Sequence, residues 1–199
     1  MGKVVAQLAM SLDGFIADKD DGCDALFGFY GRGPVAVNLS EGYPELHVSQ
    51  KTADLLVGEV ERVGATIVGR RLYDITNGWN GHTGGEVPMV VLTHEAPDDW
   101  PRDGVPIFFV SGVEAAMAKA QELAGDKDVS IAGATAAREV LDAGLLDEIV
   151  VSLVPVILGE GIPWFAGSKG PVTLSDPEVI EDEGVTHLRY RVERDRLPA

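Results

Sequence analysis

The sequence contains a single cysteine and few basic residues. Because Cys23 is the only cysteine among 199 residues, an internal disulfide and a site built from several cysteines are both excluded. Sixteen basic against thirty-two acidic side chains give a formal net charge of −16. Nucleic acids and anionic membrane surfaces bind through positive charge, so the composition argues against both as partners.

Long hydrophobic runs and the common catalytic motifs are also missing. No apolar run approaches the roughly 20 residues that span a bilayer. The chain enters a strand-like stretch at Lys3 without a basic leader, so we expect a mature cytoplasmic protein. The sequence has no P-loop, no H-E-x-x-H motif and no G-x-S-x-G motif, and we expect no metal centre.

The distribution of apolar residues predicts one α/β domain over residues 1–199. A hydrophobic fraction of 45% is enough for a sizeable core. Strand patterns at 65–68, 87–93, 106–110 and 128–132 alternate with helical patterns, one of them at 49–63, which favours a mostly parallel sheet. The strand-rich last third predicts antiparallel strands, and the weakly patterned residues 18–45 predict loops. The spacing of Ser111 and Glu114 predicts a capping box that begins a helix.

Three strand ends carry residues that suit a phosphorylated nucleotide. Ligands of such sheets bind at the carboxyl ends of the strands. Paired guanidinium groups match phosphate oxygens, although two surface arginines can equally pair with carboxylates. A hydroxyl and an imidazole at the next strand end can join them, and the free N–H groups of a helix N-terminus suit a pyrophosphate. The segments are Gly69-Arg70-Arg71, Leu92-Thr93-His94 and Gly133-Ala134-Thr135.

Five segments, in order, make the chain resemble the family that unites dihydrofolate reductases with the C-terminal reductase domain of the riboflavin-biosynthesis enzyme RibD. The first is residues 9–17, which contain Ser11-Leu12-Asp13-Gly14. The others are residues 68–73, 91–94, 132–135 and 144–165, so the resemblance covers most of the chain. It implies a dihydrofolate-reductase-like three-layer α/β/α fold, an NADPH-dependent reductase and a homodimer.

The resemblance also assigns the cofactor contacts. It implies that backbone groups of Ala9 and Ile16 hold the nicotinamide carboxamide. The groups at the adenosine 2′-phosphate would be Arg70, Arg71, Thr93 and His94, beside Gly69 and Leu92. The contacts to the pyrophosphate would come from Gly133, Ala134 and Thr135. The phosphate contacts that the resemblance implies are therefore the same strand-end residues that suit a phosphorylated nucleotide by their chemistry.

Some positions depart from the RibD pattern, and they concern the substrate. Gln7 and Phe15 stand where RibD-type reductases have lysine, and Ala132 stands where they have glutamate. We expect reduction of a small planar heterocycle, with 5-amino-6-(5-phosphoribosylamino)uracil as the substrate of the nearest family activity. The alternatives are a dihydrofolate-reductase-like enzyme acting on a pterin or another C=N or C=C acceptor, and a non-catalytic NADPH-binding module.

A catalytic carboxylate is expected beside the implied nicotinamide contacts. Reduction of a C=N bond needs a proton as well as a hydride, and Asp13 lies between Ala9 and Ile16. An Asp-Gly turn is also a common structural element, so Asp13 has a structural alternative. Trp79 is either a stacking wall of the site or a core residue, and His187 is expected on the polar face of the last strand.

Overall fold

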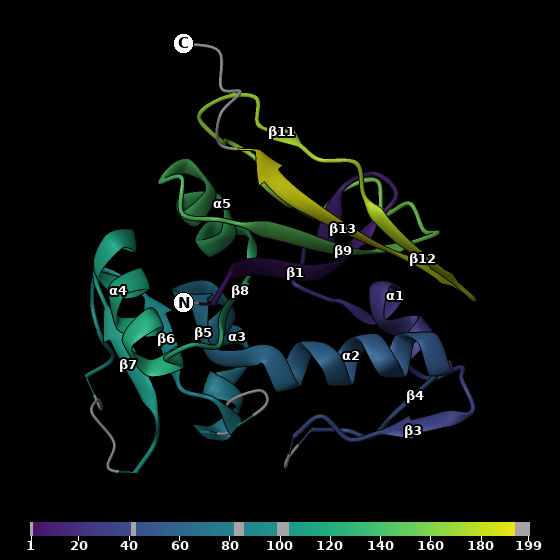
Figure 1. Ribbon diagram of the computed structural model, residues 1–199, viewed down its shortest axis with the longest axis horizontal. Coiled ribbons are helices and arrows are strands. Elements are labelled where there is room, and N and C mark those ends of the chain that lie inside the picture. The colour runs from purple at the N-terminus through teal and green to yellow at the C-terminus, as the bar shows by residue number, and fades with distance from the viewer. Residues whose placement is uncertain (1, 41–42, 82–85, 99–103, 194–199) are drawn as a thin grey trace.

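The computed structural model describes residues 2–40, 43–81, 86–98 and 104–193, which form a nine-stranded sheet with flanking helices (Figure 1). The strand order is β11-β13-β9-β1-β8-β5-β6-β7, with β12 paired to β13. All neighbours from β9 to β7 are parallel, whereas β11, β12 and β13 pair antiparallel. The predicted mostly parallel sheet with antiparallel C-terminal strands is confirmed. The strands are β1 (Val4–Ser11), β5 (Val63–Gly69), β6 (Met89–Leu92), β7 (Ile107–Val110), β8 (Asp128–Ala132), β9 (Glu148–Val154), β11 (Thr173–Leu174), β12 (Glu178–Asp182) and β13 (Val185–Glu193).

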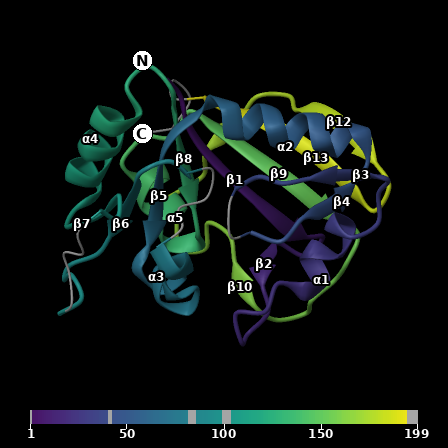
Figure 2. The ribbon, with the colours of Figure 1, turned by 90° about the horizontal axis from the view of Figure 1, so that it is seen from below.

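Helices cover both faces of the sheet (Figure 2). Side chains of β9 alternate between the faces, as strand geometry requires. Ile149 and Val151 belong to the core cluster that includes helices α4 and α5, whereas Ser152 points to His187, which contacts helix α2. The sheet therefore lies between two helical layers. The helices are α1 (Asp24–Phe27), α2 (Gln50–Arg62), α3 (Arg70–Ile75), α4 (Val113–Ala124) and α5 (Ala134–Asp142).

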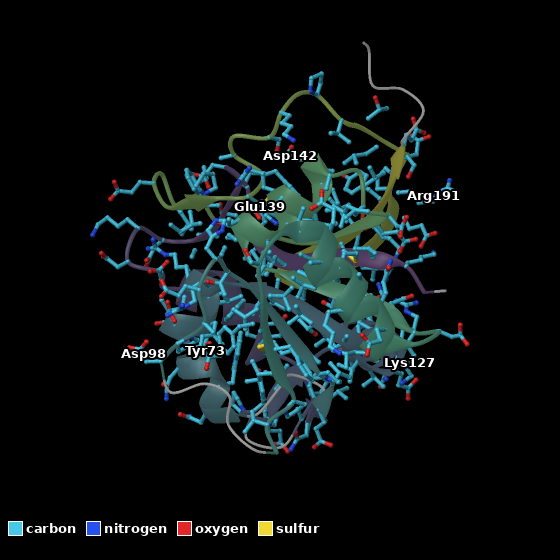
Figure 3. The ribbon with its side chains drawn as sticks, turned by 90° about the vertical axis from the view of Figure 1, so that its left-hand side faces the viewer. Tyr73, Asp98, Lys127, Glu139, Asp142 and Arg191 are labelled. Carbon is cyan, nitrogen blue, oxygen red and sulfur yellow. The ribbon has the colours of Figure 1, made fainter. Side chains whose placement is uncertain are left out.

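Small side chains bring α4 and α5 close to the sheet. Ala116 and Ala120 of α4 and Ala136 and Ala137 of α5 are fully buried in the main core cluster. Because alanine ends at Cβ, the helix backbones can approach the β-branched and aliphatic side chains of the strands closely. Figure 3 shows α4 and α5 lying over the strands. This packing fixes the N-terminus of α5 at the carboxyl edge of the sheet.

Residues 18–45 contain more regular structure than predicted. They include α1 and the short strand β3 (Val35–Val37), which pairs antiparallel with β4 (Leu46–Val48) just beyond this segment. A second small pair joins β2 (Phe15–Ala17) to β10 (Ile162–Pro163). The prediction of loops alone is wrong, since elements of three or four residues are too short to show a period in the sequence.

Two helix boundaries differ from their predictions. The helix expected at 49–63 is α2, which Ser49 caps and which ends at Arg62, because Val63 is already extended (φ −74°, ψ 135°) and begins β5. The predicted capping box is wrong. Gly112, not Ser111, is the N-cap of α4, with φ +87° and no side-chain cap bond. Glycine adopts that φ easily, so the backbone sets this helix start.

Candidate active site

A cavity of about 1110 Å³ lies at the carboxyl ends of the parallel strands. Ala9 of β1, Gly69 of β5, Leu92 of β6 and Ala132 of β8 all line it. The three strand ends that were predicted to share a site therefore meet in one cavity. The implied cofactor residues that line it are Ala9, Ile16, Gly69, Arg70, Arg71, Leu92, Thr93, His94, Gly133, Ala134 and Thr135.

The N-terminus of α5 contributes to the cavity wall. Gly133 precedes the helix with φ +90°, and no side chain caps the helix end. The first N–H groups of a helix have no intrahelical partner, and Ala134 and Thr135, which carry two of them here, line the cavity. A Cβ on Gly69 would lie 3.8 Å from the backbone nitrogen of Ala136, so the end of β5 passes close to this helix start. An anion placed here would meet N–H donors and the positive end of the helix dipole.

Arg70 and Arg71 begin α3 at the end of β5, and both have carboxylate partners. Arg70 Nε donates to the two Asp74 oxygens at 2.8 and 3.0 Å, and its Nη1 donates to the Glu95 carbonyl at 2.8 Å. Arg71 donates to both Asp21 oxygens, at 2.9 and 2.8 Å, and these bonds raise the pKa of Arg71. The carboxylate pairing considered from the sequence is present. The two side chains are still 38% and 64% exposed, so an incoming phosphate can reach both.

These residues fit a phosphorylated dinucleotide. Two guanidinium groups and the Thr93 hydroxyl can hold one phosphate, while the uncapped start of α5 can hold a pyrophosphate. Ile16 and Leu92 add apolar surface to the same wall. The volume of the cavity lies slightly above the roughly 300–1,000 Å³ of ordinary ligand pockets, so the cavity can take a ligand larger than a typical small molecule.

Aromatic side chains also line the cavity. They are Trp79, Phe27, which is 45% exposed, and Tyr43. Burial raises the pKa of Tyr43 to about 12. Trp79 also packs, partly buried, against the core cluster around Val68, in agreement with its predicted core role, whereas its role as a stacking wall stays a prediction. Residues 77–80 all have φ between 48° and 54°, a left-handed turn that non-glycine residues rarely form. Such strained turns concentrate at functional sites, and this one carries Trp79 into the wall.

The lining of the cavity carries charges of both signs. Among the lining residues that the structure describes, positive charge is confined to Arg70, Arg71 and, when protonated, His94. The acidic residues that line it are Asp20, Asp21, Glu95 and Glu139. Glu139 lies on α5, where Figure 3 labels it together with Asp142.

Asp13 lies outside the set of described residues that line the cavity. Its carboxylate accepts hydrogen bonds from the Ser11 hydroxyl at 2.6 Å and from the N–H groups of Leu158 and Gly159 at 3.1 and 2.7 Å. The Ser11 bond is the main cause that lowers the pKa of Asp13, and the backbone bonds add to it. The carboxylate therefore stays ionised at neutral pH and ties its turn to the segment after β9. This geometry supports the structural alternative.

Sequence reasoning missed a buried polar chain between the sheet and α2. His187 is 2% exposed, with Nδ1 2.9 Å from the Ser152 hydroxyl and Nε2 2.9 Å from the Thr52 hydroxyl, which donates to Asp182 at 2.7 Å. His187 lies on the polar face of β13, as expected, but α2 covers this face, so the imidazole is buried. The available signal was the strand period: Val185 is buried, and His187 follows it by two residues.

Two features are absent from the part of the chain that the structure describes. No group of three or more histidine, cysteine, aspartate or glutamate side chains there is placed to hold a metal ion. None of the helices described is long and apolar enough to cross a membrane.

Known proteins share both the sequence pattern and the fold. The family model of the RibD C-terminal domain matches residues 2–188. The uncharacterized protein YwjB of Bacillus subtilis is 26% identical over 163 residues, 82% of each chain. A Shewanella sp. PV-4 protein whose name links it to riboflavin biosynthesis superimposes with a TM-score of 0.73 at 23% identity, covering 98% of this chain and 100% of that one. Dihydrofolate reductase of Enterococcus faecalis, complexed with NADP(H), gives a TM-score of 0.59 at 16% identity and covers 96% of each chain.

Proposed function

The chain belongs to the RibD C-terminal domain family, and from this premise we propose that it is an NADPH-dependent reductase that transfers hydride to a small planar heterocycle. One observation carries the proposal: the strand-end arginines, the hydroxyl–imidazole pair and the bare start of α5 converge in one cavity. The complex of the similarly folded Enterococcus faecalis dihydrofolate reductase with NADP(H) supports the choice of nucleotide.

Each wall of the cavity has a part in the proposed cofactor site. Guanidinium groups and N–H donors would hold the phosphates, and the backbone of Ala9 and Ile16 would orient the nicotinamide ring. The phosphate-holding residues would be Arg70, Arg71, Thr93, His94, Gly133, Ala134 and Thr135. NADPH, when bound, supplies the hydride, and the apolar wall excludes water from the ring.

The remaining wall favours an unphosphorylated substrate. Phe27 and Trp79 offer flat apolar surface on which a ring can stack. Because the cofactor would take both arginines and His94, no basic side chain among the described lining residues is left to hold a sugar phosphate. Among the alternatives, a pterin or another C=N or C=C acceptor therefore fits this wall better than 5-amino-6-(5-phosphoribosylamino)uracil, whose reduction is the nearest family activity. The proton would come from water, since the ionised Asp13 has none to give.

The test is NADPH oxidation by the purified protein with a panel of acceptors, followed by the loss of NADPH absorbance. The panel pairs 5-amino-6-(5-phosphoribosylamino)uracil with its dephosphorylated form and adds dihydropterins. We expect an unphosphorylated member to be reduced. NADPH binding with no oxidation across the panel would favour the non-catalytic module, and no binding at all would refute both functions.

Substituting Asp13→Asn separates the two interpretations of that carboxylate. A general acid or base contributes about 10²- to 10⁴-fold to the rate. We expect kcat to fall far less than this and Tm to fall, because the bonds to Leu158 and Gly159 weaken. A loss of kcat of about a hundredfold or more, with Tm unchanged, would show that Asp13 is catalytic.

We also propose a homodimer, as the resemblance implies. The apolar residues 149–158 are only partly covered: Val151 and Val154 of β9 are buried, whereas Ile157, which follows β9, is 70% exposed. Leu12, 62% exposed, donates its N–H to the Val156 carbonyl and so lies beside Ile157. Sedimentation of the wild type and of Ile157→Lys should show a dimer that weakens in the variant. A wild-type monomer would contradict the proposal.

A further inference from the structure

The loop between β2 and α1 holds one of the two cavity arginines through a carboxylate. Asp21 lies 50 positions before Arg71 in the sequence, and its two carboxylate oxygens accept from Nε and Nη2 of that guanidinium at 2.9 and 2.8 Å. Both residues line the cavity. Figure 2 shows the β2–α1 segment and α3 in the same part of the molecule. The pair thus joins two segments that would border a bound nucleotide.

The loop is built to present this carboxylate. Asp18 Oδ1 accepts hydrogen bonds from the N–H groups of Asp20 and Gly22, both at 2.8 Å, and the Asp18 N–H donates to the Gly22 carbonyl at 2.9 Å. Asp21 itself adopts φ +66°, a left-handed conformation that aspartate and asparagine tolerate better than most residues. The position of its carboxylate is therefore set by the loop backbone.

A carboxylate and a phosphate compete for the same face of a guanidinium group. Two parallel N–H donors match either anion in a forked arrangement, and Asp21 already uses the Nε–Nη2 fork of Arg71. An arriving phosphate must displace it, after which two anions lie close together. NADH has no 2′-phosphate, so it can bind without breaking this pair.

From this geometry we infer that Asp21 sets the cofactor affinity and specificity of the site: its carboxylate occupies Arg71 in place of the 2′-phosphate of NADPH and must yield when NADPH binds. The inference rests on the proposed function, because it needs Arg71 to hold that phosphate. Asp21 thereby weakens NADPH binding and narrows the preference for NADPH over NADH, which favours release of the oxidised cofactor after turnover.

The experiment is a fluorescence titration of the wild type, Asp21→Asn, Arg71→Ala and the double variant with NADPH and with NADH. Asparagine keeps the left-handed backbone and removes the charge. Exposed ion pairs are worth little, so we expect Asp21→Asn to bind NADPH about two- to fivefold more tightly and NADH within a factor of about two. On the Arg71→Ala background, Asp21→Asn should have no further effect on NADPH.

Asp24→Asn is the matched control. Asp24 begins α1 three positions later, is exposed, does not line the cavity, and its substitution makes the same change in net charge. If Asp24→Asn gained as much NADPH affinity as Asp21→Asn, the effect would come from overall charge, and the inference would be overturned. Unchanged or weaker NADPH binding by Asp21→Asn would also overturn it, provided Arg71→Ala weakens NADPH. If the wild type binds neither nucleotide, the proposed function fails first.

Discussion

Replacing His187 with glutamine tests the buried polar chain between the sheet and α2. The imidazole is almost fully buried, and burial lowers its pKa from 6.5 although the nearby Asp182 opposes the shift. In the unfolded chain the same group keeps its ordinary value. Below pH 6.5 the unfolded state therefore binds a proton that the folded state does not, and the free energy of unfolding falls as the pH falls.

The size of the effect follows from this one group. One proton changes the free energy of unfolding by at most about 1.4 kcal/mol per pH unit. Asp182 is the other titratable group of this polar chain. Burial tends to raise the pKa of Asp182, but hydrogen bonds from Ser49 and Thr52 outweigh burial and leave this pKa below 3.8. The stability that ionised Asp182 contributes is therefore present above pH 3.8 and is lost only in stronger acid. The interval from pH 6.5 down to about 5 therefore reports mainly on His187.

Urea unfolding followed by tryptophan fluorescence, at several pH values through this interval, measures the slope. We expect the wild type to lose stability as the pH falls and His187→Gln to show a flatter profile. At neutral pH the variant should be less stable by about 1–3 kcal/mol, because Ser152 and Thr52 lose well-placed partners. His47→Gln, a change at a half-exposed residue of β4, should keep the wild-type slope. A slope that persists in His187→Gln would refute the reasoning.

Two further substitutions test the start of α5 and the start of α2. Gly133 and Gly125 both have positive φ, so alanine at either position should cost about 1–3 kcal/mol of unfolding free energy. Only Gly133→Ala should weaken NADPH binding, because Gly125 ends α4 away from the cavity wall. Equal NADPH affinity in the two variants would contradict the phosphate role of the turn at Gly133. Ser49→Ala removes the cap on Thr52 N–H and the hydroxyl bond to Asp182, and urea unfolding should show a loss of about 1–2 kcal/mol.

The sequence predicted those parts of the structure that depend on local periodicity. The alternation of strands and helices predicted a parallel sheet. In such a sheet the carboxyl ends of the strands share one edge, which is where Gly69, Leu92 and Gly133 lie. Features that depend on long-range placement escaped prediction. The burial of His187 requires α2 to cross its strand, and the Asp21–Arg71 pair joins segments whose spacing carries no local signal.

The aromatic wall escaped for a related reason. Phe27 and Tyr43 come from the weakly patterned first quarter of the chain, where short elements leave no periodic trace. Their position in the cavity follows from how this segment packs beside β1 and α3, which local residue patterns do not encode. The strand-end residues of the cavity were therefore predictable, whereas those of its aromatic wall were not.

The most direct test of the account is a fluorescence titration of the wild type and Arg70→Ala with NADPH and NADH. Hydrogen bonds between a guanidinium group and a phosphate are among the stronger ones, worth about 1.5–3 kcal/mol. We therefore expect the wild type to prefer NADPH by about tenfold or more, and Arg70→Ala to bind NADPH with an affinity near that for NADH. Equal binding of the two nucleotides by the wild type, or binding of neither, would contradict the claim that this cavity holds the 2′-phosphate of NADPH.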